Sequence, residues 1–123
     1  MEKNAVGWFE IYVQDLPRAR AFYEAVLGQK LQKIEAGGLE MWAFAWQQGA
    51  MGASGALVKM QGVPSGGNST LVYFMCDDTA VEEGRVAKSG GKVFKPKFAI
   101  GEHGFVSLVY DTEGNLFGLH SMK

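Results

Sequence analysis

The sequence of 123 residues has one cysteine, three prolines and no hydrophobic run near the ~20 residues that a transmembrane helix needs. A lone cysteine, Cys76, cannot form an internal disulfide, so the sequence predicts a cytoplasmic protein. The first residues, MEKNAVGWF, lack the n-region and h-region of a signal peptide. The net charge of −1 argues against nucleic acid or an anionic membrane as a partner.

Hydrophobic residues and glycine are plentiful. The hydrophobic fraction of 47% is enough to build a core, and 17 glycines predict many tight turns. The length fits one compact domain, or two small modules that share a core.

The first structured segment alternates between two kinds of side chain. Phe9, Ile11 and Val13 form an apolar row, whereas Trp8, Glu10 and Tyr12 form the other row, as on a strand. A helix follows, with Asp15 as its N-cap, Pro17 in its first turn and Gly28 at its end. The segments QKLQKIEA, LEMWAFAW and SGALVKM predict three more strands, so the first half has the order βαβββ.

The second half repeats this order. STLVYFMC predicts a strand, DDTAVEEGRVAKSGG a capped helix, and KVFKPKF, GFVSLVYD and NLFGLHS three strands. Asp15 to Gly28 spans 13 residues, as does Asp78 to Gly91, and a shift of 63 residues aligns the rows that face the helices. An internal duplication follows. The predicted organisation is one module at 1–60, a polar linker at 61–69 and a second module at 70–123.

Two βαβββ modules predict an α+β fold. Their sheets would curl into one partly open, cup-shaped mixed sheet with both helices outside. The rows that contain Trp8 and Leu71 would line the cup, which is the kind of concave, mostly apolar surface that binds small molecules.

The chain resembles the vicinal-oxygen-chelate superfamily, which includes glyoxalase I, bleomycin-resistance proteins and extradiol dioxygenases. VQDLPRARAFYEAVLG in the first half and CDDTAVEEGRVAKSGGKV and LVYDTEGNLFGLHS in the second carry the resemblance. The details are most similar to small bacterial proteins loosely described as lactoylglutathione-lyase-related. The resemblance implies a homodimer and a small-molecule ligand.

The metal-binding members of that superfamily carry His and Glu ligands on the first and last strand of each half. Carried over by motif, these positions are Trp8, Leu71, Gly118 and, in the first half's last strand, Gly55 or Ala56. None of these side chains offers an oxygen or imidazole nitrogen to a metal. The expectation is therefore no metal and no cofactor, which argues against glyoxalase I or dioxygenase chemistry.

Two ionisable residues are candidates for catalysis. Glu10 lies in mid-strand on the predicted cup face, where a carboxylate has a raised pKa unless it is paired, and this suits a general base. His120 lies two residues beyond Gly118, so alternation places it on the same face. Each also has a purely structural alternative. For Glu10 it is a carboxylate that is hydrogen-bonded within the core, and for His120 it is a residue at the rim of the cup or at a dimer contact. His103, in a glycine-flanked loop, is best read as a solvated residue.

Other side chains complete the predicted lining of the cup. Tyr73 and Met75 continue the row of Leu71, so the expected ligand-contacting residues are Trp8, Tyr12, Leu71, Tyr73, Met75 and Gly118. Trp42, Phe44 and Trp46 form a further aromatic row, which either fills the core or stacks on a ligand.

Two functions fit these observations. The first is a binder of a small apolar or aromatic molecule that uses no divalent metal, as in the bleomycin-resistance branch. The alternative is a lyase or isomerase related to glyoxalases, with Glu10 and His120 as its acid–base groups.

Overall fold

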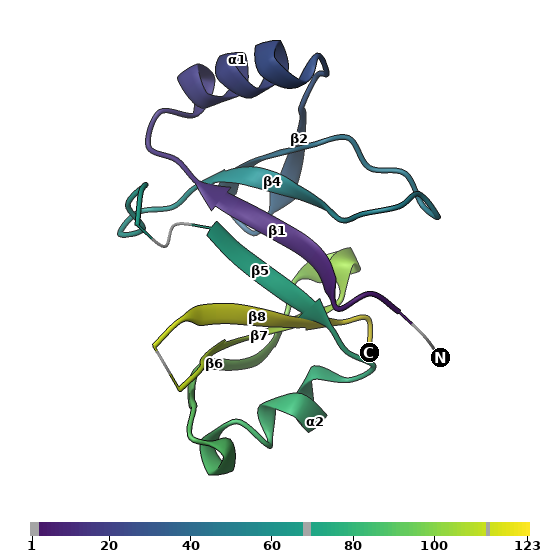
Figure 1. The fold of residues 1–123 in the computed structure, drawn as a ribbon, viewed down its shortest axis with the longest axis vertical. Coiled ribbons are helices and arrows are strands. Elements are labelled where there is room, and N and C mark those ends of the chain that lie inside the picture. Colours follow the sequence, from purple (N-terminus) through teal and green to yellow (C-terminus); the bar gives the residue numbers. More distant parts are fainter. Residues whose placement is uncertain (1–2, 68–69, 113) are drawn as a thin grey trace. The chain divides into compact units, whose positions relative to one another are not determined.

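The computed structural model describes residues 3–67, 70–112 and 114–123, which form eight strands, two α-helices and two short 3-10 helices (Figure 1). The predicted linker and the DTEGN motif each lie partly outside these residues, at 68–69 and 113. The chain divides into two compact units. The N-terminal unit is Trp8–Thr70, and the C-terminal unit is Leu71–Lys123 with the residues up to Gly7.

The N-terminal unit has the predicted βαβββ order. Its strands lie in the order β2-β3-β4-β1. β1 pairs in parallel with β4, and the other pairs are antiparallel. Its elements are β1 (Val6–Tyr12), α1 (Leu16–Leu27), β2 (Gln32–Ala36), β3 (Leu39–Ala43) and β4 (Ser54–Lys59).

The C-terminal unit repeats this arrangement. Its strands lie in the order β5-β8-β7-β6, and the first strand again pairs in parallel with the last. The α+β class with two βαβββ modules is thus confirmed, while the curvature of a common cup stays a prediction. The elements of this unit are β5 (Thr70–Met75), α2 (Thr79–Glu83), 3-10 helices at Ala87–Ser89 and Gly101–His103, β6 (Lys92–Ala99), β7 (Phe105–Tyr110) and β8 (Leu116–Ser121).

The predicted helix caps are present in both units. The Asp15 carboxylate accepts a hydrogen bond from the backbone N–H of Arg18 at 3.1 Å, and the Asp78 carboxylate accepts one from Ala80 at 3.0 Å. Gly28 ends α1 with φ of 67°, a conformation that costs glycine little.

The second helix is shorter than predicted. Instead of continuing to Gly91, α2 ends at Glu83, and Gly84 donates its N–H back to Ala80. A glycine inside a helix costs about 1 kcal/mol relative to alanine, so this sequence breaks into a turn and a 3-10 helix.

Most of the fully buried side chains lie on strands, and Thr79 of α2 joins them. Ala56, Leu57 and Val58 of β4 are 0% exposed, as is Val109 of β7. By contrast, α1 buries only Leu16 completely. The row of Phe9, Ile11 and Val13, which the sequence assigns to the core, is half-buried. α1 is the longest described helix, and no helix in the described ranges is long and apolar enough to cross a membrane.

Candidate functional site

The strand β1 presents two chemically different faces. Its pairing with β4 places Trp8 beside Ser54, Glu10 beside Ala56 and Tyr12 beside Val58. Partners in register share a face of the sheet. We call this side the Glu10 face. Phe9 and Ile11 lie on the opposite side, toward α1.

Glu10 is the central group of its face. Its side chain is buried, with 9% of the residue exposed. One carboxylate oxygen, Oε1, accepts a hydrogen bond from the Tyr12 hydroxyl at 2.7 Å, and Oε2 accepts one from Trp8 Nε1 at 3.2 Å. All three predicted residues of β1 therefore form one cluster, in which two neighbouring side chains fix a carboxylate.

The C-terminal unit presents a corresponding Tyr73 face. In the pairing of β5 with β8, Tyr73 lies beside Gly118 and Met75 lies beside His120, on the side of the sheet away from α2. Leu71 and Tyr73 are buried, whereas Met75 is 45% exposed. The register thus confirms that His120 shares the face of Gly118.

His120 is held by the loop that precedes β7. Its Nε2 lies 2.7 Å from the backbone carbonyl oxygen of His103. Because a carbonyl oxygen can only accept, Nε2 is the donor nitrogen in this bond, which leaves Nδ1 as the other ring nitrogen. His103 itself is an exposed residue.

The register also identifies the residue of β4 that corresponds to Gly118 of β8. Ala56 stands beside Glu10 as Gly118 stands beside Tyr73, so the position is Ala56 rather than Gly55. At Gly118 a Cβ atom would collide with the ring of Tyr73, so that ring covers the backbone there. Among the described residues, no three His, Cys, Asp or Glu side chains are grouped to hold a metal.

The aromatic row of the first half lies on the side of α1. The Arg20 guanidinium of α1 stacks 3.5 Å from the centroid of the Trp42 ring. Phe44 contacts Tyr23 of α1 at 5.7 Å and Phe9 at 5.6 Å between ring centroids. Trp46 follows the end of β3 and is 68% exposed. The rings of Trp42 and Phe44 therefore do not line the Glu10 face.

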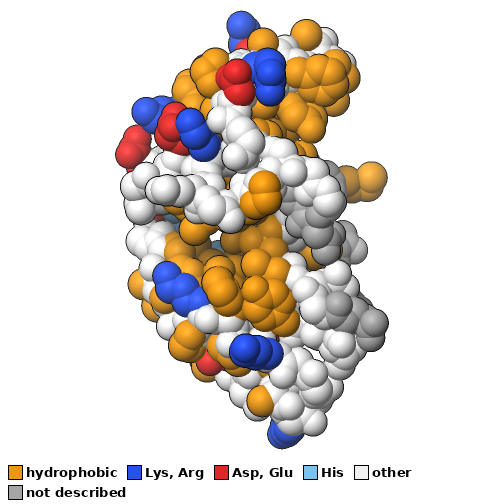
Figure 2. All heavy atoms as spheres, turned by 90° about the vertical axis from the view of Figure 1, so that its left-hand side faces the viewer, with side chains coloured by type: hydrophobic (Ala, Val, Ile, Leu, Met, Phe, Trp, Pro, Cys, Tyr) orange, Lys and Arg blue, Asp and Glu red, His pale blue; other side chains and the backbone are white. Residues whose placement is uncertain are grey.

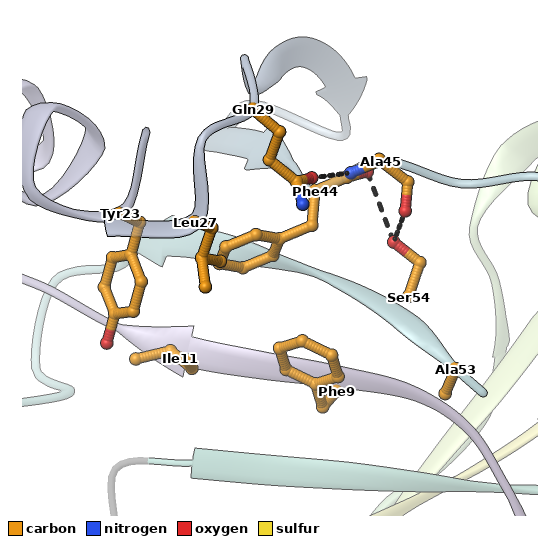
Figure 3. A pocket seen from close by; sticks show the side chains of 9 residues that line it. All are labelled: Phe9, Ile11, Tyr23, Leu27, Gln29, Phe44, Ala45, Ala53 and Ser54. Atoms are coloured by element: carbon orange, nitrogen blue, oxygen red, sulfur yellow. Dashed lines mark hydrogen bonds between the residues drawn. The ribbon is translucent and has the colours of Figure 1, made fainter. Parts of the chain in front are cut away.

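A cavity lies on the α1 side of the N-terminal unit, where the sequence predicts a packed core. It has a volume of about 300 Å³, and its lining includes Phe9, Tyr23, Phe44 and Gln29 (Figure 3). Apolar spacing identified these residues as facing one another. That spacing does not show how far a helix stands from its sheet, so the cavity could not be predicted from the sequence.

Cys76 lies on the row that faces α2. Burial raises the pKa of its thiol to about 11, and the negative charge of Glu82 adds to this effect. The thiol stays protonated near neutral pH, which fits an unreactive structural cysteine.

The comparison with protein families finds one match over part of the chain. Residues 6–41 match the family model Bleomycin resistance protein-like N-terminal. This segment contains the whole Trp8–Glu10–Tyr12 cluster. No functionally curated protein matches the chain.

Solved structures resemble the chain over nearly its full length. Methylmalonyl-CoA epimerase from Mycobacterium tuberculosis is 15% identical, with a TM-score of 0.69 over 97% of this chain and 88% of that one. A variant of the Streptomyces coelicolor epimerase in complex with 2-nitronate-propionyl-CoA is 14% identical, with a TM-score of 0.67 over 96% of both chains.

A hypothetical protein from Bacillus halodurans is 12% identical, with a TM-score of 0.70 over 99% of this chain and 96% of that one. Together with the family match over residues 6–41, these likenesses support, at the level of fold, the resemblance to the vicinal-oxygen-chelate superfamily.

Proposed function

We propose that this protein binds a small aromatic molecule at the Glu10 face, and that it does so without a divalent metal. The observation that carries the proposal is the buried Glu10 carboxylate, which the Tyr12 hydroxyl and the Trp8 indole hold in place. A fixed carboxylate recognises a ligand that offers an N–H or O–H donor, and a cationic donor most strongly. The Trp8 ring beside it supplies an apolar surface for the body of the ligand.

The family match supports this proposal. The matched residues 6–41 include the cluster, and the family is named for bleomycin-resistance proteins. The side chains at the four superfamily metal positions, Trp8, Ala56, Leu71 and Gly118, cannot coordinate a cation. Recognition would therefore rest on hydrogen bonding to Glu10 and on apolar contact. We expect Tyr12 to contribute to this contact surface. The other predicted ligand contacts, Leu71, Tyr73 and Met75, belong to the Tyr73 face of the C-terminal unit.

Metal analysis tests the first part of the proposal. Protein purified without chelators is measured by plasma mass spectrometry, and we expect far less than one equivalent of any transition metal. One equivalent of zinc, nickel, manganese or iron would overturn the metal-free interpretation.

A matched pair of probes tests the role of Glu10. Tryptamine joins an aromatic ring to an ammonium group, and indole-3-propionate joins the same ring to a carboxylate. We expect calorimetry to detect binding of tryptamine but not of indole-3-propionate. Glu10→Gln should weaken tryptamine binding about tenfold, which corresponds to ~1.4 kcal/mol. Glu35→Gln, at an exposed position of β2, is the control. Equal binding of both probes would contradict the proposal.

A second candidate function is acid–base catalysis by Glu10 and His120, as in a lyase or isomerase. The bond from His120 Nε2 to the His103 carbonyl favours it, because this bond leaves Nδ1 as the basic nitrogen of an oriented ring. Methylmalonyl-CoA epimerases among the similar folds suggest the substrate to try.

Exchange of the methylmalonyl-CoA α-proton in deuterium oxide tests this candidate. If it is right, mass spectrometry detects exchange that both Glu10→Gln and His120→Ala abolish. His103→Ala keeps the backbone carbonyl and should preserve the exchange. Wild-type protein that shows no exchange would exclude this reaction.

A further inference from the structure

The cavity beneath α1 is bounded entirely by the N-terminal unit. In Figure 3, Tyr23, Leu27 and Phe44 extend toward Phe9 and Ile11, which project from β1. The volume of about 300 Å³ equals the lower end of the range of ~300–1,000 Å³ typical of small-molecule pockets. Because successive side chains of a strand point to opposite faces, Phe9 and Ile11 of the lining lie on the side of β1 opposite Glu10. Ser54, which pairs with Trp8, also lines the cavity.

The lining is mostly apolar and aromatic, with two polar side chains, Gln29 and Ser54, and it is uncharged. The nine lining residues include no Asp, Glu, Lys, Arg or His. The rings of Tyr23 and Phe44 are nearly perpendicular, at 89°, whereas those of Phe9 and Phe44 are tilted by 36°. Such an arrangement offers both edges and faces to another ring. A charged ligand would lose its hydration here without gaining a partner.

One amide gives the cavity a polar side. Gln29 Oε1 accepts a hydrogen bond from the backbone N–H of Ala45 at 2.9 Å, which fixes the side chain in the wall. The same amide carries an NH₂ group with two donor hydrogens. A ligand with a neutral acceptor or an aromatic π-face therefore matches this wall.

The helix itself does not fill the space. Phe22, Val26 and Leu27 of α1 remain 59%, 63% and 51% exposed. Figure 2 shows hydrophobic side chains beside charged ones at the end of the molecule where Figure 1 places α1. Polar contacts hold the helix instead: Glu24 accepts from the Leu31 N–H at 2.9 Å, and Arg20 stacks on Trp42. The cavity beneath α1 is thus a consequence of the contacts that hold this helix to its sheet.

We propose that this cavity is a second binding site, separate from the Glu10 face, for a neutral, flat aromatic molecule. Entry of such a ligand would displace water from apolar walls and place a ring among Phe9, Tyr23 and Phe44. The gain comes from apolar burial and ring contacts rather than from charge.

N-phenyl-1-naphthylamine, a neutral fluorescent aromatic, is the probe for this site. We expect saturable binding of one equivalent, with ring-current shifts in NMR signals of the Ile11 and Leu27 methyl groups. Ala53→Phe at the cavity wall and Leu27→Trp on α1 should each reduce the affinity at least tenfold, because both place a ring in the space. Ala50→Phe, in the same loop but outside the lining, is the control and should bind normally.

Three results would overturn the proposal. Unsaturable binding, or shifts of Val26 without Ile11, would indicate adsorption to the exposed face of α1. Unchanged affinity in both filling variants would exclude the cavity. Loss of probe binding in Glu10→Gln would place the probe on the other side of β1. The tryptamine experiment is independent of all three, so the two sites can fail separately.

Discussion

The two units share one strand arrangement but attach their helices differently. In each unit the first strand pairs in parallel with the last, and a helix follows the first strand. The five-residue α2 packs against β6, β7 and β8, whereas the twelve-residue α1 contacts mainly β4. The longer helix thus makes the looser attachment.

Polar groups explain the close attachment of α2. The Glu83 carboxylate accepts hydrogen bonds from the Lys97 N–H and from the hydroxyl of fully buried Ser107, both at 2.7 Å. The backbone N–H of Thr79 donates to Ser121 at 3.1 Å. α1 instead reaches its sheet through rings: Arg20 stacks on Trp42 of β3, and Tyr23 contacts Phe44. The comparison teaches that the two units share one strand order, while each holds its helix by a different kind of contact.

The largest effect should come from the sheet of the N-terminal unit rather than from its helix. Leu57→Ala removes a fully buried side chain, and we expect it to cost about 2–5 kcal/mol of unfolding free energy. Leu27→Ala should cost less than about 1 kcal/mol, since that side chain is half exposed. Urea unfolding measures both. Equal costs would mean that α1 packs tightly and would break the comparison.

The Glu83 carboxylate at the end of α2 should have the next largest effect on the free energy of unfolding. Glu83→Ala leaves the Lys97 N–H and the Ser107 hydroxyl without this acceptor, and we expect a loss of about 2–3 kcal/mol. The matched change in the other unit, Glu24→Ala, removes the bond from the Leu31 N–H and the longer, 3.4 Å contact with the Arg20 guanidinium. It should cost less because no fully buried hydroxyl loses its acceptor. The same urea experiment gives both values, and the reverse order would contradict the stronger polar attachment of α2.

Two glycines of the parallel strand pairs sharpen the comparison further. A Cβ at Gly55 would meet the backbone oxygen of Phe9, whereas the atoms nearest to one at Gly118 belong to the ring of Tyr73. We expect Gly55→Ala to cost about 3 kcal/mol and Gly118→Ala about 1 kcal/mol, because a ring moves more easily than a strand. Gly84→Ala, with its nearest contact at 3.2 Å, is the control for thermal unfolding. Similar losses at Gly55 and Gly118 would show that the Tyr73 ring is as fixed as backbone.

The smallest effect concerns pH. The hydrogen bond from Lys97 lowers the pKa of Asp78 below its ordinary value. The folded state then favours the charged carboxylate, so this stabilisation is present above pH ~4 and is lost as the pH falls further. Asp78→Asn should lower the midpoint of thermal unfolding at pH 7 and lower it less at pH 3.

The neighbouring Asp77 provides the control for that measurement. Its side chain is 99% exposed, so Asp77→Asn should change the midpoint little at either pH. A pH-independent effect of Asp78→Asn would assign its role to helix capping alone, which asparagine also performs.

Local sequence signals predicted most of the fold. Alternation located β1, Asp15 and Asp78 marked the helix starts, and the repeat predicted the matching strand order. The faces of Glu10 and His120 also followed from alternation. The ending of α2 at Gly84 was missed because a capped amphipathic pattern continued past one glycine.

Features that depend on distant partners could not be predicted. The face of Trp42 was settled by its contact with Arg20, and the choice between Gly55 and Ala56 was settled by strand register. Neither relation is encoded in the spacing of neighbouring residues. The cavity beneath α1 likewise depends on how far a helix stands from its sheet.

The ring of Tyr73 over Gly118 has a consequence for how this chain can change over evolutionary time. A side chain at position 118 would have to share its space with the Tyr73 ring. The ring would have to turn aside before any residue larger than glycine could be accommodated there. We therefore expect substitutions at positions 73 and 118 to be coupled, so that the effect of one depends on the residue at the other.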